Sequence, residues 1–395
     1  MPWPPPDPSD ARGGPLAGVR VLDLSRILAG PFSAQILADL GADVIKVERP
    51  GVGDETRRWG PPFAPGGDAA YFHVCNRGRR GITADLAAPD GRALVLQLVA
   101  DADVLVENFL PGAMDRFGLG DEALTAANPR LVHAVISGYG SDSSRAAWPA
   151  LDFVVQAHAG ILSVTGPDAD TPTKAGVPIA DLSAGLYATI GVLAALRRAE
   201  ATGRGGRVEV SLAEACGSLL SNQAANHLVG GATPRALGNA HPSIAPYEVL
   251  RTQDTPIALA ATSDRQTARL FAVIGAPELA DDPRFATNAD RVRHRGALAA
   301  AIEARLTGRP CAEWVVALNE AGVAAAPINT VAGMLADPDT RAGLVTAVPG
   351  ADGGEVAQLR TPIRLDGAPL PPAARPPGLG EHDAAVRAAL RRSGT

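Results

Sequence analysis

The sequence predicts an α/β protein with two parts: a large, Rossmann-like domain on a doubly wound parallel sheet, and a smaller α+β domain. Two observations carry this prediction. Through the first half of the chain, short apolar runs alternate with stretches of helical periodicity, which is typical of strands joined by helices. From about residue 236 the alternation gives way to a pair of strand-like runs among helices, which indicates a second domain.

The first predicted unit of strand, helix and strand lies within residues 19–48. The apolar runs GVRVLDLS and ADVIKVE flank the helical stretch PFSAQILADL, with Pro31 in its first turn and Gly41 at its end. Two strands joined by a helix run parallel. The same alternation continues through ITADL at 82, a helix over 89–102, DVLVENF at 103, a helix over 121–127 and LVHAVISGYG at 131.

The rest of the chain is predicted to be mainly helical. After the loop TGRGGR the pattern indicates another helix, and the second domain contains the strand pair YEVLRT and PIALAA. Residues 349–377, rich in Gly and Pro, are expected to form an extended arm. The expected helices are DFVVQAHAGILSV from Asp152, Leu182 to about Ala199, the region VSLAEACGSLLSN, and segments near 264–275 and 295–306.

These patterns divide the chain into five segments. The predicted boundaries are a disordered lead-in over 1–15, the large domain over 16–205, a linker helix over 206–235, the small domain over 236–325, and a return linker with a C-terminal part over 326–395 that joins the large domain.

Charge and composition exclude several classes of protein. With 42 acidic and 36 basic side chains the net charge is −6, so the chain is not expected to bind nucleic acid, and any anionic ligand needs a local basic cluster. The three cysteines lie far apart, which argues against a disulfide framework and favours a reducing cytoplasm. The longest apolar run, 182–196, is shorter than the ~20 residues of a spanning helix, so we expect no membrane partner.

Several common motifs are absent from the sequence. There is no phosphate-binding G-x-x-x-x-G-K-[ST] loop, no H-E-x-x-H and no G-x-S-x-G. The G-x-G pieces at Gly138 and Gly203 lack a third glycine in register, which argues against a nicotinamide cofactor. The seven histidines do not cluster, so no metal site is predicted.

Two local features draw attention to particular residues. Asp181 directly precedes the least polar helix of the chain, where free amide groups and the helix dipole would stabilise a carboxylate; the alternative is an ordinary helix cap. Lys46 and Lys174 are the only lysines among the 36 basic residues. This reflects either codon bias or positions that need a compact ammonium group.

Longer motifs resemble those of the class III CoA-transferases, of the formyl-CoA transferase and carnitine CoA-transferase type. The resemblance runs in the family's order from about residue 16 to 386. It rests on VLDLSRILAGPF (21–32), LADLGADVIKVER (37–49), ENFLPGAMDRFGL (107–119), KAGVPIADLSAGLYATIGVLAAL (174–196), GNAHPSIAPYEVLRT (238–252) and LGEHDAAV (379–386).

The resemblance implies a catalytic aspartate at Asp181. The carboxylate attacks an acyl-CoA thioester to give an acyl-aspartyl anhydride, the CoA thiolate returns to give an aspartyl-CoA thioester, and CoA then passes to an incoming carboxylic acid through a second anhydride. Because both intermediates hydrolyse, Asp181 is expected to be sheltered from water, yet ionised. Coenzyme A enters as a substrate, no tightly bound cofactor is implied, and similar proteins are interlocked homodimers.

The resemblance also supplies candidates for binding CoA in the large domain. Arg49, Asn108 and Arg116 match positions that contact the nucleotide, and Arg26 matches a position beside the CoA. The motif NRGRRG adds Asn76 and a basic cluster with Arg77. The alternative for each arginine is a solvated surface charge. The full set of candidates is Arg26, Leu28, Arg49, Asn76, Arg79, Arg80, Asn108, Arg116 and Tyr139.

Substrate preference is inferred from the loop GNAHPSIAPY, which contains His241. It resembles members that use dicarboxylic acids such as succinate or glutarate. It lacks the glycine run of the oxalate-specific members, and Leu28 stands where those have Gln. Two departures from the family pattern concern the CoA site: Ser143 and Ser144 replace a common Gly-Pro, and Ser137 stands where some relatives have Lys.

Two other functions remain open for the same fold. An α-methylacyl-CoA racemase needs two acid/base groups, one of them from a Gly-His-Asp triplet. The corresponding residues here are Ala150, Leu151 and Asp152, so the histidine is missing. A non-catalytic acyl-CoA-binding paralogue would keep the basic residues but lose the carboxylate, whereas Asp181 is present.

Overall fold

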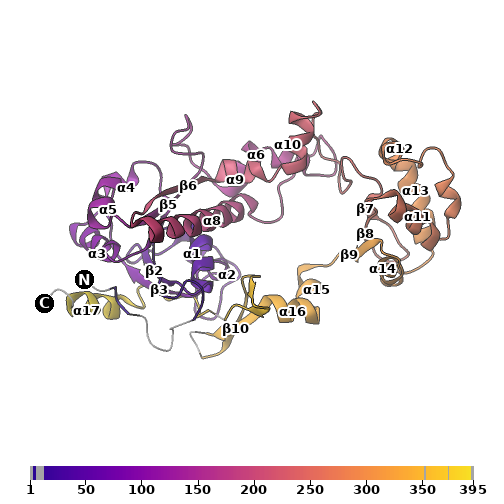
Figure 1. Ribbon diagram of the computed structural model, residues 1–395. Helices are drawn as coiled ribbons and strands as arrows, with labels where there is room; N and C mark the ends of the chain where they lie inside the picture. The colour runs from indigo at the N-terminus through magenta and orange to yellow at the C-terminus, as the bar shows by residue number, and fades with distance from the viewer. Residues whose placement is uncertain (1–2, 6–12, 351–352, 372, 393–395) are drawn as a thin grey trace. The chain divides into compact units, whose positions relative to one another are not determined.

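The computed structural model describes residues 3–5, 13–350, 353–371 and 373–392 (Figure 1). The chain forms two compact units. The first comprises Met1–Ile161, Ala175–Asn222 and Pro338–Thr395, and the second comprises Leu162–Lys174 and Gln223–Asp337.

The first unit is built on a six-stranded parallel sheet, which confirms the predicted α/β class. Its strand order is β3-β2-β1-β4-β5-β6, and each neighbouring pair is parallel. The order reverses between β1 and β4. The strands are β1 (Arg20–Asp23), β2 (Asp43–Glu48), β3 (Arg79–Thr83), β4 (Val104–Glu107), β5 (Val132–Ser137) and β6 (Gly206–Ser211).

Helices cover both faces of this sheet because successive strand residues point to opposite sides. Val21 of β1 packs with α1 (Ala29–Asp39) and α8 (Ile179–Thr202), which lie side by side in Figure 1. Leu22, the next residue, packs with α3 (Pro89–Val99), α5 (Asp121–Ala127) and α17 (Asp383–Arg392) on the other face. Two more helices, α6 (Asp152–His158) and α9 (Leu212–Ser218), pack on the same face of the sheet as α8.

The strand β6 differs from the sequence prediction, which placed a loop and then a linker helix at this point. Its residues alternate between partial burial and exposure over GRVEVS, because it is the edge strand and pairs only with β5. The segment 206–235 therefore begins inside the sheet. It continues with α9 and with α10 (Ser221–Leu228).

The second unit has its own core around a three-stranded antiparallel sheet. The predicted strand pair is present as β7 (Tyr247–Leu250) and β8 (Ile257–Ala260), and β9 (Ala324–Pro327) adds a third strand beside β8. Buried apolar residues such as Leu259 and Phe271 fill the space between sheet and helices. The helices are α11 (Asp264–Val273), α12 (Asn288–Arg293), α13 (Arg295–Leu306), α14 (Cys311–Glu320) and α15 (Val331–Ala336).

The C-terminal part returns to the first unit. It forms α16 (Pro338–Leu344) and the hairpin β10 (Val345–Pro349) with β11 (Glu355–Leu359), so the predicted arm contains paired strands. The remaining short elements of the chain are η2 (Glu55–Arg58), α2 (Ala70–His73), α4 (Ala113–Arg116), α7 (Ile161–Val164), η3 (Pro277–Ala280), β12 (Arg364–Leu365) and β13 (Ala368–Pro369).

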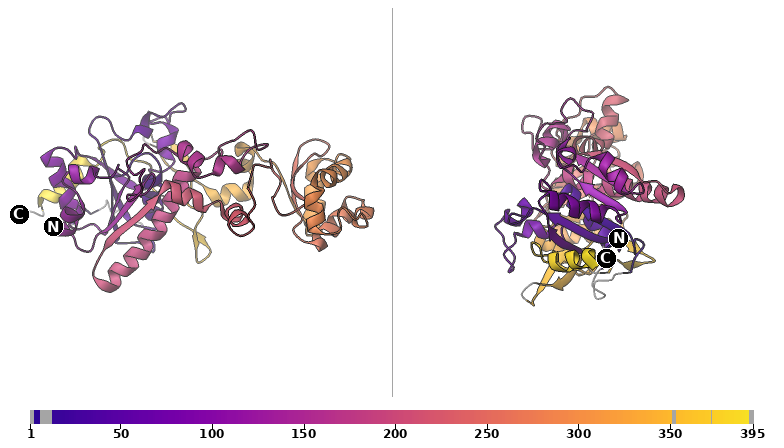
Figure 2. Two further views of the ribbon diagram at one scale, coloured as in Figure 1. Left: turned by 90° about the horizontal axis from the view of Figure 1, so that it is seen from above. Right: turned by 90° about the vertical axis from the view of Figure 1, so that its left-hand side faces the viewer.

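The two ends of the first unit lie together, and Figure 2 shows α17 beside the N-terminal segment in both views. Trp3 is buried with Val386 and Leu390 of α17, and its Nε1 donates to Asp43 at 2.7 Å. Within the segment 1–15, predicted as a disordered lead-in, residues 3–5 thus make defined contacts, whereas residues 1–2 and 6–12 lie outside the described part of the chain.

The helix α8 is longer than the predicted run. It has 24 residues, against the 15 counted in the apolar stretch, and by length and composition alone it passes as a membrane-spanning helix. Half of its most apolar window is buried inside the protein, and its small residues pack on β5 and β6. In this structure it is a core helix of the first unit.

Candidate active site

The candidate site lies where the order of strands in the sheet reverses. In open α/β sheets ligands bind outside the carboxyl ends of the strands at such a point. Here the loops after β1 and β4 meet: the Arg26 amide donates to Asn108 Oδ1 at 2.8 Å, and Asn108 Nδ2 donates to the Arg26 carbonyl at 2.7 Å. The structure therefore brings two predicted CoA-binding residues together.

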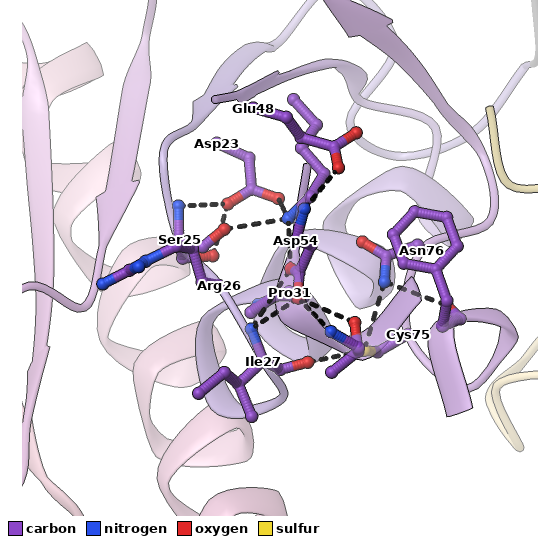
Figure 3. A network of polar contacts seen from close by, with 12 residues as sticks. Asp23, Ser25, Arg26, Ile27, Pro31, Glu48, Asp54, Cys75 and Asn76 are labelled. Atoms are coloured by element: carbon purple, nitrogen blue, oxygen red, sulfur yellow. Dashed lines mark hydrogen bonds and ion pairs between the residues drawn. The ribbon is translucent and has the colours of Figure 1, made fainter. Parts of the chain in front are cut away.

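The turn after β1 holds a residue in an unusual backbone conformation. Ile27 has φ of 70°, a region that a β-branched residue rarely occupies. Its amide donates to Asp54 Oδ2 at 3.2 Å, and its carbonyl accepts from the Cys75 thiol. Figure 3 shows Asp23 and Asp54 directed toward this turn. These buried partners hold the turn, and with it Arg26 and Leu28, in place.

A fully buried lysine connects the partners of this turn. Lys46 Nζ donates to the Ser25 carbonyl at 2.8 Å and lies 3.2 Å from Asp54 Oδ2 and 3.8 Å from Asp23 Oδ2. Burial alone would lower the pKa of Lys46, but Asp23, Asp54 and Glu48 raise it. Burial would likewise raise the pKa of Asp54, but Lys46 and hydrogen bonds from Thr56 lower it. Both groups therefore stay charged.

The environment of Lys46 favours a need for a compact ammonium group, rather than codon bias, as the reason why this position holds a lysine. A single ammonium group reaches a backbone carbonyl and two carboxylates inside a closed core, where a planar guanidinium would need more room. The carboxylate of Asp23 is shared with Arg79 and with Ser25, whose hydroxyl donates to it.

The predicted basic cluster of NRGRRG has a structural function here. Arg79 Nη1 lies 2.5 Å from Asp23, and its other terminal nitrogen donates to the carbonyls of Pro31 and Cys75. Arg80 pairs with Asp43 at 2.7 Å, and Arg77 pairs with Asp39 at 2.5 Å. All three side chains are buried, so these charges are neutralised within the protein and we leave them out of the CoA site.

The remaining predicted CoA ligands divide into exposed and buried residues. Arg26 is exposed, pairs with Glu55 at 2.9 Å and lies over the Phe109 ring. Arg49 after β2 and Arg116 at the end of α4 are also exposed. The buried ones are Leu28, Asn76 and Tyr139.

The buried candidates have distinct surroundings. Asn76 Nδ2 donates to the Phe72 carbonyl, while its Oδ1 has no hydrogen-bond partner among the residues that the structure describes. Tyr139 packs edge-on against Trp148 and His158. Ser137, which stands where some relatives have Lys, is buried at the end of β5, and its hydroxyl accepts from the Gly140 amide.

Asp181 lies in the first turn of α8, but it does not cap the helix. The helix begins two residues earlier, after Pro178, which offers no capping bond. The capping group is Asp152, whose Oδ1 accepts from the amides of Ala180 at 2.8 Å and of Asp181 at 3.3 Å. The predicted cap position was therefore wrong, because the capping carboxylate comes from a residue 29 positions earlier in the chain.

The face of α8 that carries Asp181 is turned toward α1. One turn along, a Cβ on Gly185 would meet the Ala29 carbonyl oxygen at 2.7 Å, and one turn further the Thr189 hydroxyl donates to the Ser33 hydroxyl. Residues four apart share a helix face, and their side chains lean toward the N-terminus. Asp181 therefore projects toward the start of α1, where the turn Ser25–Leu28 lies.

The surroundings of Asp181 change its protonation. It is partly buried, and burial together with the charge of Asp152 raises its pKa to about 7. A carboxyl group with this pKa takes up and loses its proton near neutral pH, so the ionised state expected from the resemblance is favoured as the pH rises above 7. Burial and the charge of Asp181 in turn raise the pKa of Tyr71 in α2 to about 12.

Sequence reasoning missed two neighbours of Asp181. Tyr71 lies in a short helix, and Trp59 packs against its ring at 5.3 Å; no motif marks either aromatic residue. Asp152 was considered only as part of a racemase triplet. Its capping role could have been suspected from the missing cap residue before Ile179, since Pro178 cannot supply one.

His241, predicted in the substrate loop, belongs to the second unit. Its ring lies 5.1 Å from Tyr247, its Nδ1 accepts from the Ser243 amide, and its carbonyl accepts from Arg295. Burial and the Arg295 charge lower the pKa of His241. The ring is therefore neutral at physiological pH.

No metal site accompanies these groups. Within the described ranges, no three His, Cys, Asp or Glu side chains gather as metal ligands would. The groups that the structure places at the site are a partly buried carboxylate, two neighbouring loops that hold Arg26 and Asn108, and a backbone turn fixed by buried charges.

Comparisons with known proteins show which family the chain resembles. The sequence profile described as CoA-transferase family III matches residues 16–383. The chain is 42% identical over 385 residues to a succinate–glutarate CoA-transferase of Agrobacterium fabrum, covering 96% of each. It is 36% identical over 369 residues to the human succinyl-CoA:glutarate CoA-transferase, covering 93% of this chain and 84% of the relative.

Solved structures resemble the whole chain as well. A CAIB/BAIF family protein from Brucella suis matches with a TM-score of 0.86 at 45% identity, covering 96% of this chain and all of that one. A hypothetical protein from Mycobacterium tuberculosis matches with a TM-score of 0.84 at 31% identity, covering 95% and 99%.

Proposed function

The chain belongs to CoA-transferase family III, and from this membership we propose that it moves CoA from a dicarboxylyl-CoA donor to a carboxylic acid through covalent intermediates on Asp181. The observation that carries the proposal is the position of Asp181. Its carboxyl group is partly buried. It projects from α8 toward the loops after β1 and β4, where the order of strands in the sheet reverses.

The proposed reaction balances as two exchanges. A carboxylate oxygen of Asp181 attacks the thioester carbonyl, the C–S bond breaks, and CoA leaves as thiolate. The thiolate then attacks the Asp181 carbonyl of the anhydride, which releases the donor acid and leaves an aspartyl-CoA thioester. The acceptor carboxylate reverses the two steps and regenerates Asp181. Every intermediate stays activated, whereas a serine nucleophile would form a stable ester.

The free carboxyl group must lose its proton before it can attack. Because burial and Asp152 raise the pKa of Asp181 to about 7, we expect the rate of the first half-reaction to rise with pH and to level off above pH 7. The higher pKa also makes the ionised group a stronger nucleophile than an ordinary carboxylate.

The proposed CoA site uses the loops at the switch point. Arg26 and Asn108 meet there, and Arg49 and Arg116 are exposed after β2 and β4. In a chain with a net negative charge, these three arginines and one asparagine thus supply local positive charge and polar groups for the phosphates of CoA. Leu28, at the start of α1, is buried, so it supports the turn that carries Arg26.

A dicarboxylic acid is the proposed substrate class. Two relatives at 42% and 36% identity carry names with succinate or succinyl-CoA and glutarate, and the loop with His241 resembles members of this kind. Another relative, at 40% identity, is named an acetyl-CoA:oxalate CoA-transferase, so oxalate belongs in any substrate panel.

We further propose a cytoplasmic homodimer with no tightly bound cofactor. Three residues on the outer face of α8 support the dimer, because Leu186, Tyr187 and Ile190 are 50%, 43% and 61% exposed. An apolar face of this kind on one chain is typical of a surface that pairs with another chain.

The experiment that tests the proposed function compares the wild type with Asp181→Ala. Purified protein is incubated with succinyl-CoA and a panel of acids that includes glutarate and oxalate, and each CoA ester is read by mass. We expect transfer by the wild type and none by the variant, with CoA binding retained by calorimetry. Transfer by Asp181→Ala would overturn the assignment, and CoA binding without transfer by the wild type would favour the non-catalytic paralogue.

A further inference from the structure

The carboxylate of Asp152 is held by three hydrogen bonds at the start of α8. Its Oδ1 accepts from the amides of Ala180 and Asp181, and its Oδ2 accepts from Gln156 Nε2 at 2.6 Å. Gln156 Oε1 in turn accepts from the Ala175 amide at 2.9 Å. The same chain of bonds therefore fixes the segment before the helix and its first turn.

The direction of these bonds shows which form of Asp152 they stabilise. A backbone amide can only donate, so Gln156 must turn its oxygen toward Ala175 and its NH2 group toward Asp152. Asp152 then accepts in all three bonds. A carboxylate accepts without loss, whereas a protonated acid would place a hydrogen against a donor.

The groups around Asp181 can be named element by element. Among the described residues, Asp152 of α6 is the charged group that acts on it. Tyr71 of α2 is neutral at physiological pH because burial raises its pKa to about 12, and Cys216 of α9, beside Asp152, is neutral because burial raises its pKa to about 11. From α1, Ala29 presents a backbone carbonyl to the same face of α8.

We propose that Asp152 is a positioning residue for the reaction at Asp181: it caps α8 and keeps a negative charge beside the reacting carboxylate, which favours the covalent states over the free carboxylate. This inference rests on the proposed function. A free helix N-terminus would stabilise an ionised Asp181. Here Asp152 occupies the amides and replaces that attraction with repulsion.

The physical effect follows from the change of charge during the reaction. Free Asp181 is negative above pH 7, whereas its anhydride and its CoA thioester are uncharged at the same atoms. The repulsion from Asp152 therefore raises the free energy of the starting state and is relieved in both intermediates. One pKa unit of such repulsion corresponds to about a tenfold change in the covalent equilibrium.

The variant that isolates the charge is Asp152→Asn. Asparagine keeps an oxygen for the amides of Ala180 and Asp181 and loses only the bond with Gln156. We expect the pH profile of the first half-reaction to move to lower pH, and the ratio of enzyme carrying CoA to free enzyme at pH 8.5, measured by intact mass after acid quench, to fall about tenfold for each pH unit of that movement.

The control is Ser183→Ala, which removes a hydrogen bond from the same turn, Ser183 Oγ to the Ala180 carbonyl at 3.1 Å, without changing charge. We expect its profile and covalent fraction to match the wild type. If Asp152→Asn does not fold, as judged by circular dichroism, Asp152→Ser replaces it, since serine is uncharged and keeps a hydroxyl oxygen that can accept a hydrogen bond.

The outcomes separate this inference from the proposed function. An unchanged pH profile and covalent fraction in Asp152→Asn or Asp152→Ser, together with loss of transfer in Asp181→Ala, would overturn the role of Asp152 and leave the function standing. A covalent adduct that persists in Asp181→Ala would overturn both.

Discussion

Asp181 shows how neighbouring groups decide the chemistry of one carboxyl group. At a helix start, free amides would lower its pKa, but Asp152 takes up the amides of Ala180 and Asp181. Burial and the charge of Asp152 then raise the pKa of Asp181 to about 7. The pKa of Asp181 thus lies near neutral pH, as those of acid/base and nucleophilic groups often do.

This raised pKa predicts a cost in stability that depends on pH. An unfolded Asp has a pKa of 3.8, so the folded protein loses stability as pH rises from about 4 to about 7 and the loss is complete above pH 7. Asp181→Asn removes it. The free energy of unfolding, measured with urea, is compared between Asp181→Asn and the wild type at two pH values. We expect the difference in favour of the variant to be about 2 kcal/mol larger at pH 8 than at pH 5. The same difference in free energy of unfolding between variant and wild type at both pH values would contradict the raised pKa of Asp181.

At the scale of elements, the turn after β1 depends on a buried lysine. Lys46→Met leaves Asp54 and the Ser25 carbonyl in the core without their cation. Breaking a buried pair in this way costs about 3–5 kcal/mol, and the loosened turn should weaken CoA binding through Arg26. Unfolding and calorimetry measure the two effects.

The chain offers a matched control for this variant in its only other lysine. Lys174 is exposed, so Lys174→Met should change the free energy of unfolding by much less than Lys46→Met, because an exposed charge is already solvated. Equal effects of the two substitutions would rule out a special role for Lys46.

The close approach of α1 and α8 makes a second prediction about elements. A Cβ at Gly185 would lie 2.7 Å from the Ala29 carbonyl oxygen, so Gly185→Ala should force the helices apart one turn from Asp181. We expect a loss of about 1–3 kcal/mol in stability and a lower rate of transfer. Gly217→Ala in α9, where a Cβ meets nothing within 4 Å, is the control and should be neutral or stabilising; an equally neutral Gly185→Ala would contradict the packing.

The elements also show what the sequence could and could not reveal. Strands β1, β2, β4 and β5 were predicted because they are buried on both faces and read as continuous apolar runs. The edge strand β6, half exposed, was missed. The start of α8 was misplaced because its capping group, Asp152, comes from another helix, and local propensity does not record such a contact.

The candidate site was predictable to a similar extent. The resemblance pointed to Asp181, Arg26 and Asn108, which the fold places at one edge of the first unit. It also pointed to Arg79 and Arg80, but a row of arginines in a sequence does not show which carboxylates will neutralise them. Their partners, Asp23 and Asp43, lie on neighbouring strands.

At the scale of the whole molecule, the proposed homodimer predicts a measurable mass. The chain has a mass of 40.4 kDa, so light scattering should give about twice that value for the wild type. Ile190→Glu places a charge on the exposed apolar face of α8, which should destabilise the dimer, whereas Glu122→Gln in α5, exposed on the other side of the sheet, should not. A wild type that elutes as a monomer would contradict the proposal.

The proposed function depends on a covalent intermediate at Asp181, and trapping it is the most direct test. The protein is mixed with succinyl-CoA without an acceptor, treated with hydroxylamine, digested and analysed by mass spectrometry. We expect a hydroxamate on Asp181 that is absent in Asp181→Asn. Turnover without this modification, or a modification at another residue, would contradict it.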